Sequence, residues 1–238
     1  NVPQKTDAAL HSIEKLTPDL WEFRFDSTGP TRFLPGQYAK LSLPGVGGPR
    51  SYSMSYVANE DGRWLFQIKR VEGGAASEVL FEDSLTDLNI TIDAPYSIAH
   101  LKSDSPRPAI CVAGGSGLAP MVSILHGIAQ LEDTKPDPVL YYGARNSRDV
   151  VDKSYFKTIR GFSPDDQYIP VVSEPEESDR WSGATGMIHE FLKTSLEEAS
   201  HEYEYYIAGP PPMVDGVRRH LVLDRGVPVE QLHYDRFF

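Results

Sequence analysis

The stretch from Tyr205 to Met213 reads Tyr-Tyr-Ile-Ala-Gly-Pro-Pro-Pro-Met and could hold two flat rings face to face for a transfer reaction. An apolar run ends at Gly209, and three prolines follow, which fix φ and suit a tight loop or a helix start. Apolar residues then recur at helical spacing, so the stretch predicts strand, rigid loop and helix. Ligands bind at such strand ends in open α/β sheets. Taken alone, the stretch fits plain architecture equally well.

A second stretch, Gly114-Gly115-Ser116-Gly117-Leu118-Ala119-Pro120, lies between an apolar strand predicted at 109–113 and a helix predicted at 121–131. Glycines permit a tight turn and a close approach of the backbone to phosphate. No Gly-Lys-Ser or Gly-Lys-Thr follows, which disfavours a nucleotide triphosphatase. The strand–glycine–helix context favours a nucleotide-binding loop over a plain turn.

Arg50-Ser51-Tyr52-Ser53 opens a strand in the first half of the chain. An arginine can hold a pyrophosphate through bidentate, charge-assisted hydrogen bonds. In a strand both serines point one way and Tyr52 the other, so phosphate and a flat ring could bind together. Taken alone, these four residues are more often an ordinary strand with a surface arginine.

Gln67-Ile68-Lys69-Arg70 leads into Gly73-Gly74-Ala75-Ala76-Ser77. Small residues at a helix start expose backbone N–H groups that bind anions, and the Ser77 hydroxyl can add a donor. The alternative is a glycine turn with a helix cap. Lys69 and Arg70 are either anion ligands or solvated charges.

Tyr141-Tyr142-Gly143-Ala144-Arg145-Asn146-Ser147-Arg148-Asp149 stands at the end of the next predicted strand. Arg145 and Arg148 could contact a ribose or a phosphate. Asp149 could bind a ribose or cap the following helix, and the cap is favoured.

The two halves of the chain that carry these stretches have different sequence patterns. Up to about residue 100, short alternating runs and turn signals predict a small antiparallel barrel or sandwich, with one helix. Beyond it, strands and helices alternate, which predicts a parallel sheet covered by helices. The predicted strands are 20–25, 38–43, 64–71, 88–92, 109–113, 138–143, 168–172 and 203–207, and the predicted helices are 76–82, 121–131, 155–160, 187–196 and 214–224. The predicted linker is 101–108.

Composition excludes several classes of protein. The chain has 238 residues, 40% hydrophobic and 24% charged, as in a soluble globular protein. Its length favours two domains over one. A net charge of −11 argues against a nucleic-acid binder and gives no support for binding an anionic membrane. No apolar run approaches a membrane span, and no signal peptide is visible. Cys111 is the only cysteine, which rules out an intrachain disulfide and a cysteine-ligated cluster. We expect a cytoplasmic monomer without a metal site.

Four of these stretches resemble the ferredoxin–NADP⁺ reductase superfamily of flavoproteins. Residues 50–53 match its Arg-x-Tyr-Ser flavin motif, and 74–77 match its Gly-x-x-Ser motif. Residues 114–120 resemble its Gly-Gly-Thr/Ser-Gly-x-Ala-Pro loop, and 208–213 its Cys-Gly-Pro-Pro-x-Met loop. The motifs follow the family's order over nearly the whole chain. The resemblance implies a six-stranded antiparallel β-barrel that binds FAD over 1–101 and an α/β parallel-sheet domain that binds NAD(P)H over 102–238.

Two further stretches, 142–145 and 233–238, resemble the reductase components of bacterial aromatic-ring oxygenases, of the carbazole dioxygenase and toluene or phenol monooxygenase types. Those reductases carry an N-terminal [2Fe–2S] ferredoxin domain, which a chain with one cysteine cannot contain. Either that domain has been removed or the electron acceptor is a separate protein. We favour removal, with Asn1 as a linker residue, because the chain starts without Met in a polar stretch before the barrel.

The resemblance implies that NADH gives a hydride to FAD, which passes single electrons to an iron–sulfur centre and through it to an oxygenase. It places Ser53 near the hydride-accepting nitrogen and Phe237 or Phe238 over the flavin. Ala208 replaces the family's cysteine and is expected to line the nicotinamide pocket. The family's acidic residue near the C-terminal aromatic appears here as Asp235, whose shorter side chain leaves its role open. The predicted catalytic residues are Ser53, Ala208, Asp235, Phe237 and Phe238. The residues predicted to bind the cofactors are Arg50, Ser51, Tyr52, Ser53, Ile68, Lys69, Gly74, Ala75, Ser77, Gly115, Ser116, Gly117, Arg145, Gly209, Pro210 and Met213.

Several alternatives stay open. Arg145 or Arg148 could read the 2′-phosphate of NADPH, and FMN could replace FAD. Because Ala208 departs from the motif, the chain could be an electron-transfer or regulatory flavin module with poor NADH turnover. A flavin-free, nucleotide-binding interaction protein is the third class.

Overall fold

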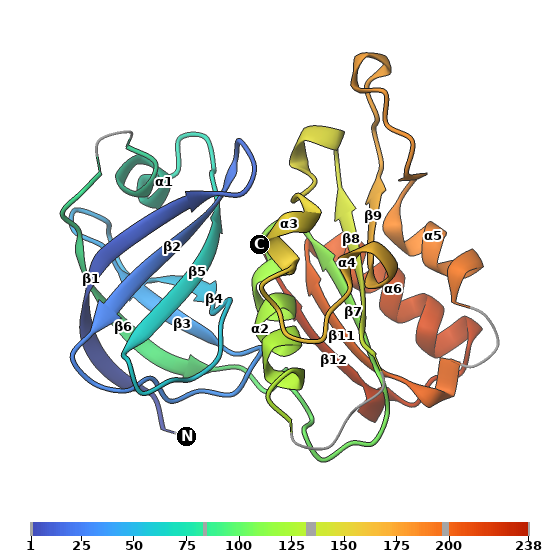
Figure 1. Ribbon diagram of the computed structural model, residues 1–238, viewed down its shortest axis with the longest axis horizontal. Coiled ribbons are helices and arrows are strands. Elements are labelled where there is room, and N and C mark those ends of the chain that lie inside the picture. The colour runs from blue at the N-terminus through green and yellow to red at the C-terminus, as the bar shows by residue number, and fades with distance from the viewer. Residues whose placement is uncertain (1, 83–84, 132–136, 197–199, 238) are drawn as a thin grey trace.

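The computed structural model describes residues 2–82, 85–131, 137–196 and 200–237. Figure 1 shows two bodies side by side, a barrel of N-terminal strands and a C-terminal sheet with helices on both faces. The predicted division at residues 101 and 102 falls between the last barrel strand and the first strand of the second sheet.

The N-terminal body is a nearly closed antiparallel barrel. Its strands follow the order β4-β3-β6-β1-β2-β5, and the two edge strands meet at a bridge between Met54 and Phe66. This closure confirms the predicted six-stranded barrel over the sandwich. The elements are β1 (Gln4–Lys15), β2 (Leu20–Ser27), β3 (Tyr38–Ser42), β4 (Arg50–Ser53), β5 (Arg63–Lys69), α1 (Ala75–Leu80) and β6 (Asn89–Tyr96).

Strand β1 corrects the sequence prediction, which took these residues as a polar stretch before the barrel. β1 pairs with β2 along one edge and with β6 along the other. Of its twelve residues only Ala8 is buried, so the strand has no apolar alternation to reveal it. Backbone pairing on both sides holds it in place. The predicted linker residue Asn1 lies outside the described residues.

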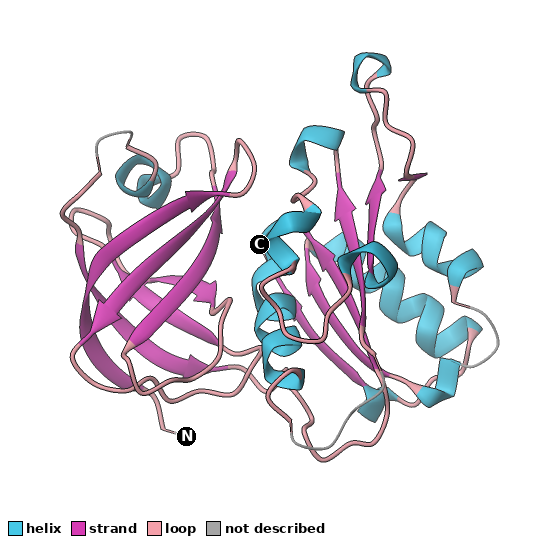
Figure 2. Cartoon of the chain, viewed as in Figure 1, coloured by secondary structure: helices cyan, strands magenta, loops and turns pink. Residues whose placement is uncertain are grey.

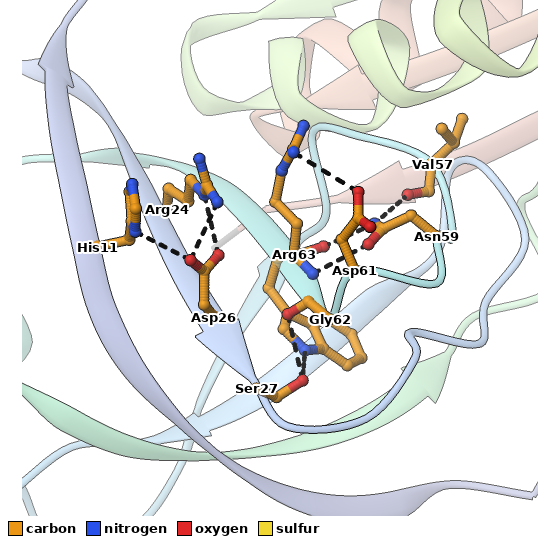
Figure 3. Close-up of polar contacts among 10 residues, drawn as sticks. His11, Arg24, Asp26, Ser27, Val57, Asn59, Asp61, Gly62 and Arg63 are labelled. Atoms are coloured by element: carbon orange, nitrogen blue, oxygen red, sulfur yellow. Dashed lines mark hydrogen bonds and ion pairs between the residues drawn. The ribbon is translucent and has the colours of Figure 1, made fainter.

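A polar network holds the loop that leads into β5 (Figure 3). The Asn59 amide nitrogen donates to the carbonyls of Val57 and Arg63, at 3.0 and 2.9 Å, and its oxygen accepts from Arg63 N–H. Ser27 Oγ donates to the Gly62 carbonyl at 3.2 Å and accepts from the Trp64 indole at 3.1 Å. These bonds fix the start of β5, the strand whose far end carries Lys69.

The C-terminal body is a parallel sheet in the order β10-β9-β8-β7-β11-β12. Its strands are β7 (Ala109–Gly114), β8 (Val139–Ala144), β9 (Tyr168–Val172), β10 (Ala184–Thr185), β11 (Glu204–Gly209) and β12 (Leu232–Arg236). The chain runs outward from β7 to β10 and then resumes on the other side of β7 at β11. The carboxyl ends of β7 and β11 therefore flank the switch point, where such sheets bind ligands. β10 and β12 were not predicted, since one is two residues long and the other lies in the half-exposed C-terminal motif.

Helices cover both faces of this sheet (Figure 2). They are α2 (Leu118–Ile128), α3 (Lys153–Phe156), α4 (Pro164–Gln167), α5 (Ile188–Ser195) and α6 (Pro211–Arg219), which continues as a π-helix over His220–Asp224. Short 3₁₀ turns lie at Gly115–Gly117, Ser147–Asp149, Glu177–Asp179, Ser200–Glu202 and Val229–Gln231. One apolar core packs the sheet against α2 and α3, and another packs it against α5 and α6. No helix in the described ranges is long and apolar enough to cross a membrane.

Helix α2 faces the barrel and joins the two bodies (Figure 1). Ser123 Oγ accepts from Gly36 N–H at 3.2 Å and donates to the Tyr56 carbonyl at 2.5 Å. A Cβ on Gly127 would lie 2.6 Å from Pro35 Cγ, so helix α2 packs closely on the Pro35 ring there. This junction orients β5 of the barrel toward the carboxyl end of the sheet.

Candidate cofactor and nucleotide site

A pocket of about 300 Å³ opens at the carboxyl ends of β7, β8 and β9. Gly114, Gly143 and Val171 line it from the ends of the three strands, and Pro210 lines it from the proline loop. The barrel completes the wall with Lys69 and with residues of the β1–β2 hairpin. The pocket therefore lies where the topology predicts a ligand and is built by both bodies.

The glycine loop and the proline loop interlock at this pocket. A Cβ on Gly117 would lie 2.1 Å from the Ala208 carbonyl oxygen, and one on Gly114 would lie 2.5 Å from Met213 Sδ. Gly115 adopts a φ of +55°, which favours glycine. Gly115 and Ser116 are half-buried and open to the solvent side. The structure thus brings two motifs nearly a hundred residues apart into direct contact.

Lys69 adds a positive charge to the glycine loop from the barrel. Its Nζ lies 3.8 Å from the position that a Cβ on Gly115 would take. An exposed ammonium beside glycine backbone is suited to a diphosphate. The neighbouring Ile68 is 1% exposed within the barrel core, which leaves its backbone for any contact with a cofactor. Arg70 points elsewhere, with its guanidinium 6.0 Å from the Phe81 ring.

Arg145 lines the same pocket, and its Nε donates to Glu174 Oε2 at 2.9 Å. Asp149 also lines the pocket, and its carboxylate accepts from Asn146 N–H at 3.2 Å in a reciprocal capping box. Asp149 is thus the third residue of the turn Ser147–Asp149, whose N-cap is Asn146. The favoured role of Asp149 as the cap of the following helix is wrong, since Asp152 caps α3. Arg148 is exposed and does not line the pocket.

The flavin motif of β4 contains an unsatisfied hydroxyl. Ser53 is 3% exposed, and its Oγ has no hydrogen-bond partner among the described residues. A buried donor without a partner costs about 1–3 kcal/mol, so this hydroxyl is suited to hydrogen-bond a bound cofactor. Ser51 is exposed on the same strand, and burial raises the pKa of the half-buried Tyr52.

Arg50 folds back onto its own loop, where Nη1 donates to the carbonyls of Gly47, Gly48 and Pro49 at 3.0–3.3 Å. Binding a pyrophosphate would replace these bonds. They are exposed and therefore exchange readily with a charged ligand.

The second flavin motif lies at the start of α1. Ser77 Oγ accepts from Val71 N–H at 2.9 Å, which leaves its own proton free to donate. Gly74 is the N-cap without a side-chain bond, and Ala75 is exposed beside it. The helix start therefore offers N–H groups and one hydroxyl, as predicted from the sequence.

Ala208 is 1% exposed and lies on the α2 face of the sheet. It lines a small cavity of about 10 Å³ together with Asp235. Pro210 and Met213, two and five residues later, line the large pocket. The expected place of the Ala208 side chain in a nicotinamide pocket stays a prediction.

Asp235 joins the last strand to the barrel. Ser97 Oγ donates to Asp235 Oδ2 at 2.9 Å, and burial raises the pKa of this carboxyl to about 6, against the lowering effect of the Ser97 bond. Phe237 is half-buried against the core between sheet and α2, and its N–H donates to the Gly209 carbonyl at 2.9 Å. Phe238 lies outside the described residues.

Sequence reasoning missed a buried polar cluster between the bodies. Glu22 of β2 accepts from Tyr155 of α3 at 2.7 Å and from Ser55 at 2.8 Å. Glu22 is 7% exposed, and burial raises its pKa. The sequence signal was Glu22, a charged residue between apolar residues in the run 20–25. Alternation alone places such a residue on the solvent-facing side of a strand. The pocket-lining residues Thr17, Asp19 and Glu174 belong to no motif.

A glycine cradle, a cation above it and an unsatisfied serine hydroxyl fit FAD and a nicotinamide nucleotide together. Fold and site thus define an oxidoreductase with one domain for FAD and one for the nicotinamide nucleotide. Comparison with known proteins agrees, since residues 7–100 match the oxidoreductase FAD-binding domain family and residues 111–219 the oxidoreductase NAD-binding domain family.

The chain is 36% identical over 238 residues to the ferredoxin–NAD(P)⁺ reductase CarAd of Metapseudomonas resinovorans, covering 98% of this chain and 69% of CarAd. It is 34% identical to the xylene/toluene monooxygenase electron transfer component XylA of Pseudomonas putida, covering 100% and 67%. The solved ferredoxin reductase in carbazole 1,9a-dioxygenase superposes with a TM-score of 0.90 at 34% identity, over 99% of this chain and 70% of that one. The chain belongs to the ferredoxin–NAD(P)⁺ reductase family and is an oxidoreductase acting on NAD(P)H.

Proposed function

We propose that the chain accepts a hydride from NADH onto FAD and passes single electrons to a [2Fe–2S] centre of the ferredoxin type, which supplies an aromatic-ring oxygenase. The observation that carries this proposal is the pocket shared by the two bodies, in which Lys69 of the barrel lies over Gly115 of the nucleotide loop. A nucleotide held there extends toward the barrel strands that carry the flavin motifs.

The chain's own residues orient and bind. The glycine loop and Lys69 hold the diphosphate of the nucleotide, and Pro210 and Met213 form a rigid wall for its reactive ring. Ser53 directs its hydroxyl to the flavin ring, and Arg50, Gly74 and Ser77 hold the flavin phosphates. When bound, FAD supplies the two-electron to one-electron conversion.

The charges of the pocket support NADH over NADPH. Asp19, Asp149 and Glu174 line it against the two cations Lys69 and Arg145. Glu174 also neutralises Arg145, the cation best placed to read a 2′-phosphate. A dianionic phosphate would meet a carboxylate there, whereas a ribose hydroxyl could donate to it.

The names of the relatives support the proposed identity of the electron acceptor. CarAd is a ferredoxin reductase, and XylA is an electron transfer component of a monooxygenase. This chain spans about two thirds of the length of these relatives. We infer that its acceptor carries a ferredoxin-type cluster.

Anaerobic stopped-flow spectroscopy tests the proposal. The FAD-loaded protein is mixed with NADH or with NADPH, and bleaching of the flavin band is followed. We expect NADH to bleach the band and NADPH to give a second-order rate constant for flavin reduction that is lower by about two orders of magnitude. A band that NADH leaves unchanged would indicate a regulatory flavin module, and preference for NADPH would refute the role of Glu174.

A further inference from the structure

A second pocket, of about 420 Å³, lies between the barrel and the part of the C-terminal body that carries α2 and α3. The barrel contributes Glu14, Lys15, Glu22 and Tyr56, and the C-terminal body contributes His126 and Asp152. None of the described residues lines both this pocket and the nucleotide pocket. The flavin motifs and the nucleotide loop leave this pocket unassigned.

Glu22 is the buried acid of this pocket, and only one of its two carboxylate oxygens is saturated. Oε2 accepts from the Ser55 hydroxyl, the Gln67 amide and the Tyr155 hydroxyl, at 2.8, 3.2 and 2.7 Å. No described residue donates to Oε1, and this atom is not sealed from the pocket. Burial raises the pKa of Glu22, and the three hydrogen bonds act against this shift. They hold the carboxyl group rigidly, so Oε1 is an oriented acceptor, and a bound cation would favour the ionised form.

The pocket carries negative charge. Glu14 lies directly opposite Glu22 in the β1–β2 pairing, and Asp152 adds a third carboxylate. Lys15 is the cation that lines the pocket, with its Nζ 4.3 Å from the Trp21 ring. Burial lowers the pKa of His126 to about 4, so this ring is neutral at pH 7. A charged ligand matching these groups is a cation.

The walls favour an organic cation over a metal ion. The Tyr56 and His126 rings meet edge-on at 4.8 Å and offer flat apolar surface. The described part of the chain contains no group of three His, Cys, Asp or Glu side chains suited to a metal. A cation with N–H donors can instead satisfy the free carboxylate oxygen and cover the rings.

We propose that this second pocket binds a small organic cation, an amidinium, guanidinium or primary ammonium, whose N–H groups donate to Glu22 Oε1 while its carbon skeleton packs on Tyr56 and His126. The site is separate from the proposed hydride transfer and does not depend on it.

Calorimetric titration of the FAD-loaded protein with benzamidine tests this proposal. We expect saturable binding of one benzamidine per chain, and no saturable binding of its neutral analogue benzamide or of benzoate. Saturating NADH should not displace it. Glu22→Gln keeps the side chain's size, and we expect it to weaken binding at least about tenfold, because a charge-assisted bond is lost.

A second pair of variants guards against misfolding of Glu22→Gln. Thr158 is exposed, lines the pocket and donates from Oγ1 to the carbonyl three residues earlier, at 3.0 Å. Thr194 on α5 is exposed and makes the same bond at 2.9 Å. Thr158→Trp should abolish benzamidine binding, whereas Thr194→Trp should leave it unchanged. The proposal is overturned if benzamidine does not bind, if benzamide binds equally well, or if Thr158→Trp binds like the wild type.

Discussion

Gly117 and Ala208 are in contact through space that only a glycine leaves open, since a Cβ on Gly117 would lie 2.1 Å from the Ala208 carbonyl oxygen. Gly117 ends the nucleotide loop, and Ala208 precedes the proline loop on the neighbouring strand β11. The contact fixes the position of the nucleotide loop relative to the proline loop. The pocket for a nucleotide thus depends on a backbone approach rather than on a side-chain bond.

Gly117→Ala is expected to destabilise the fold by about 3 kcal/mol or more, because the obstructing atom is backbone and cannot move cheaply. Urea unfolding followed by circular dichroism measures this. Gly29→Ala is the matched control, since its Cβ would meet no atom within 4 Å. Equal stability of the two variants would show that the loops are not interlocked.

Lys69→Ala is expected to raise KM for NADH about tenfold while leaving the flavin spectrum intact, because the ammonium over Gly115 is lost from the diphosphate site. Steady-state kinetics against NADH concentration measures this. Lys5→Ala removes an exposed charge at the start of β1 and controls for net charge. An unchanged KM in Lys69→Ala would remove Lys69 from the site.

Ser53→Ala is expected to be harmless to the stability of the FAD-free protein but harmful to flavin reduction in the FAD-loaded protein. Without FAD it removes an unsatisfied buried hydroxyl, so the free energy of unfolding should be unchanged or rise by about 1 kcal/mol. With FAD it should slow flavin reduction by NADH about tenfold. Ser42→Ala, at the exposed end of the neighbouring strand β3, should change neither quantity. A loss of stability without FAD would mean that Ser53 has a structural partner.

Asp235→Asn is expected to change the pH dependence of stability. Because the pKa of Asp235 is about 6 in the folded protein and 3.8 ordinarily, the folded state binds the proton more tightly. Its free energy of unfolding therefore falls as pH rises between these two values. The variant should lose this slope and gain on the order of 1 kcal/mol at pH 7, since an amide oxygen still accepts from Ser97. Urea titrations from pH 4 to 7 measure this slope, and Asp7→Asn controls for the loss of one negative charge. Equal slopes for the wild type and Asp235→Asn would contradict the expectation.

The sequence revealed what is periodic or rich in glycine and proline. Apolar alternation predicted four barrel strands, and the glycine and proline loops lie where their strand–helix context placed them. Strand β1 was not predicted, because a strand held by backbone pairing on both edges needs few buried apolar side chains. The contact of Lys69 with Gly115 and the bond from Tyr155 to Glu22 escaped because each joins elements whose approach is set by the packing of two bodies.

Ala208 remains the position where this chain departs from the family motif, and Ala208→Cys tests what the departure does. The methyl group faces a cavity of about 10 Å³ shared with Asp235, room for roughly one water-sized group, so a sulfur can enter without a large rearrangement. We expect the variant to keep its FAD content and to change the rate of flavin reduction by NADH, because the new side chain sits at the base of the proline wall, against Asp235. Anaerobic stopped-flow reduction of both forms measures this rate. Identical rates would make Ala208 a neutral replacement of the cysteine and would assign the motif's contribution to its prolines alone.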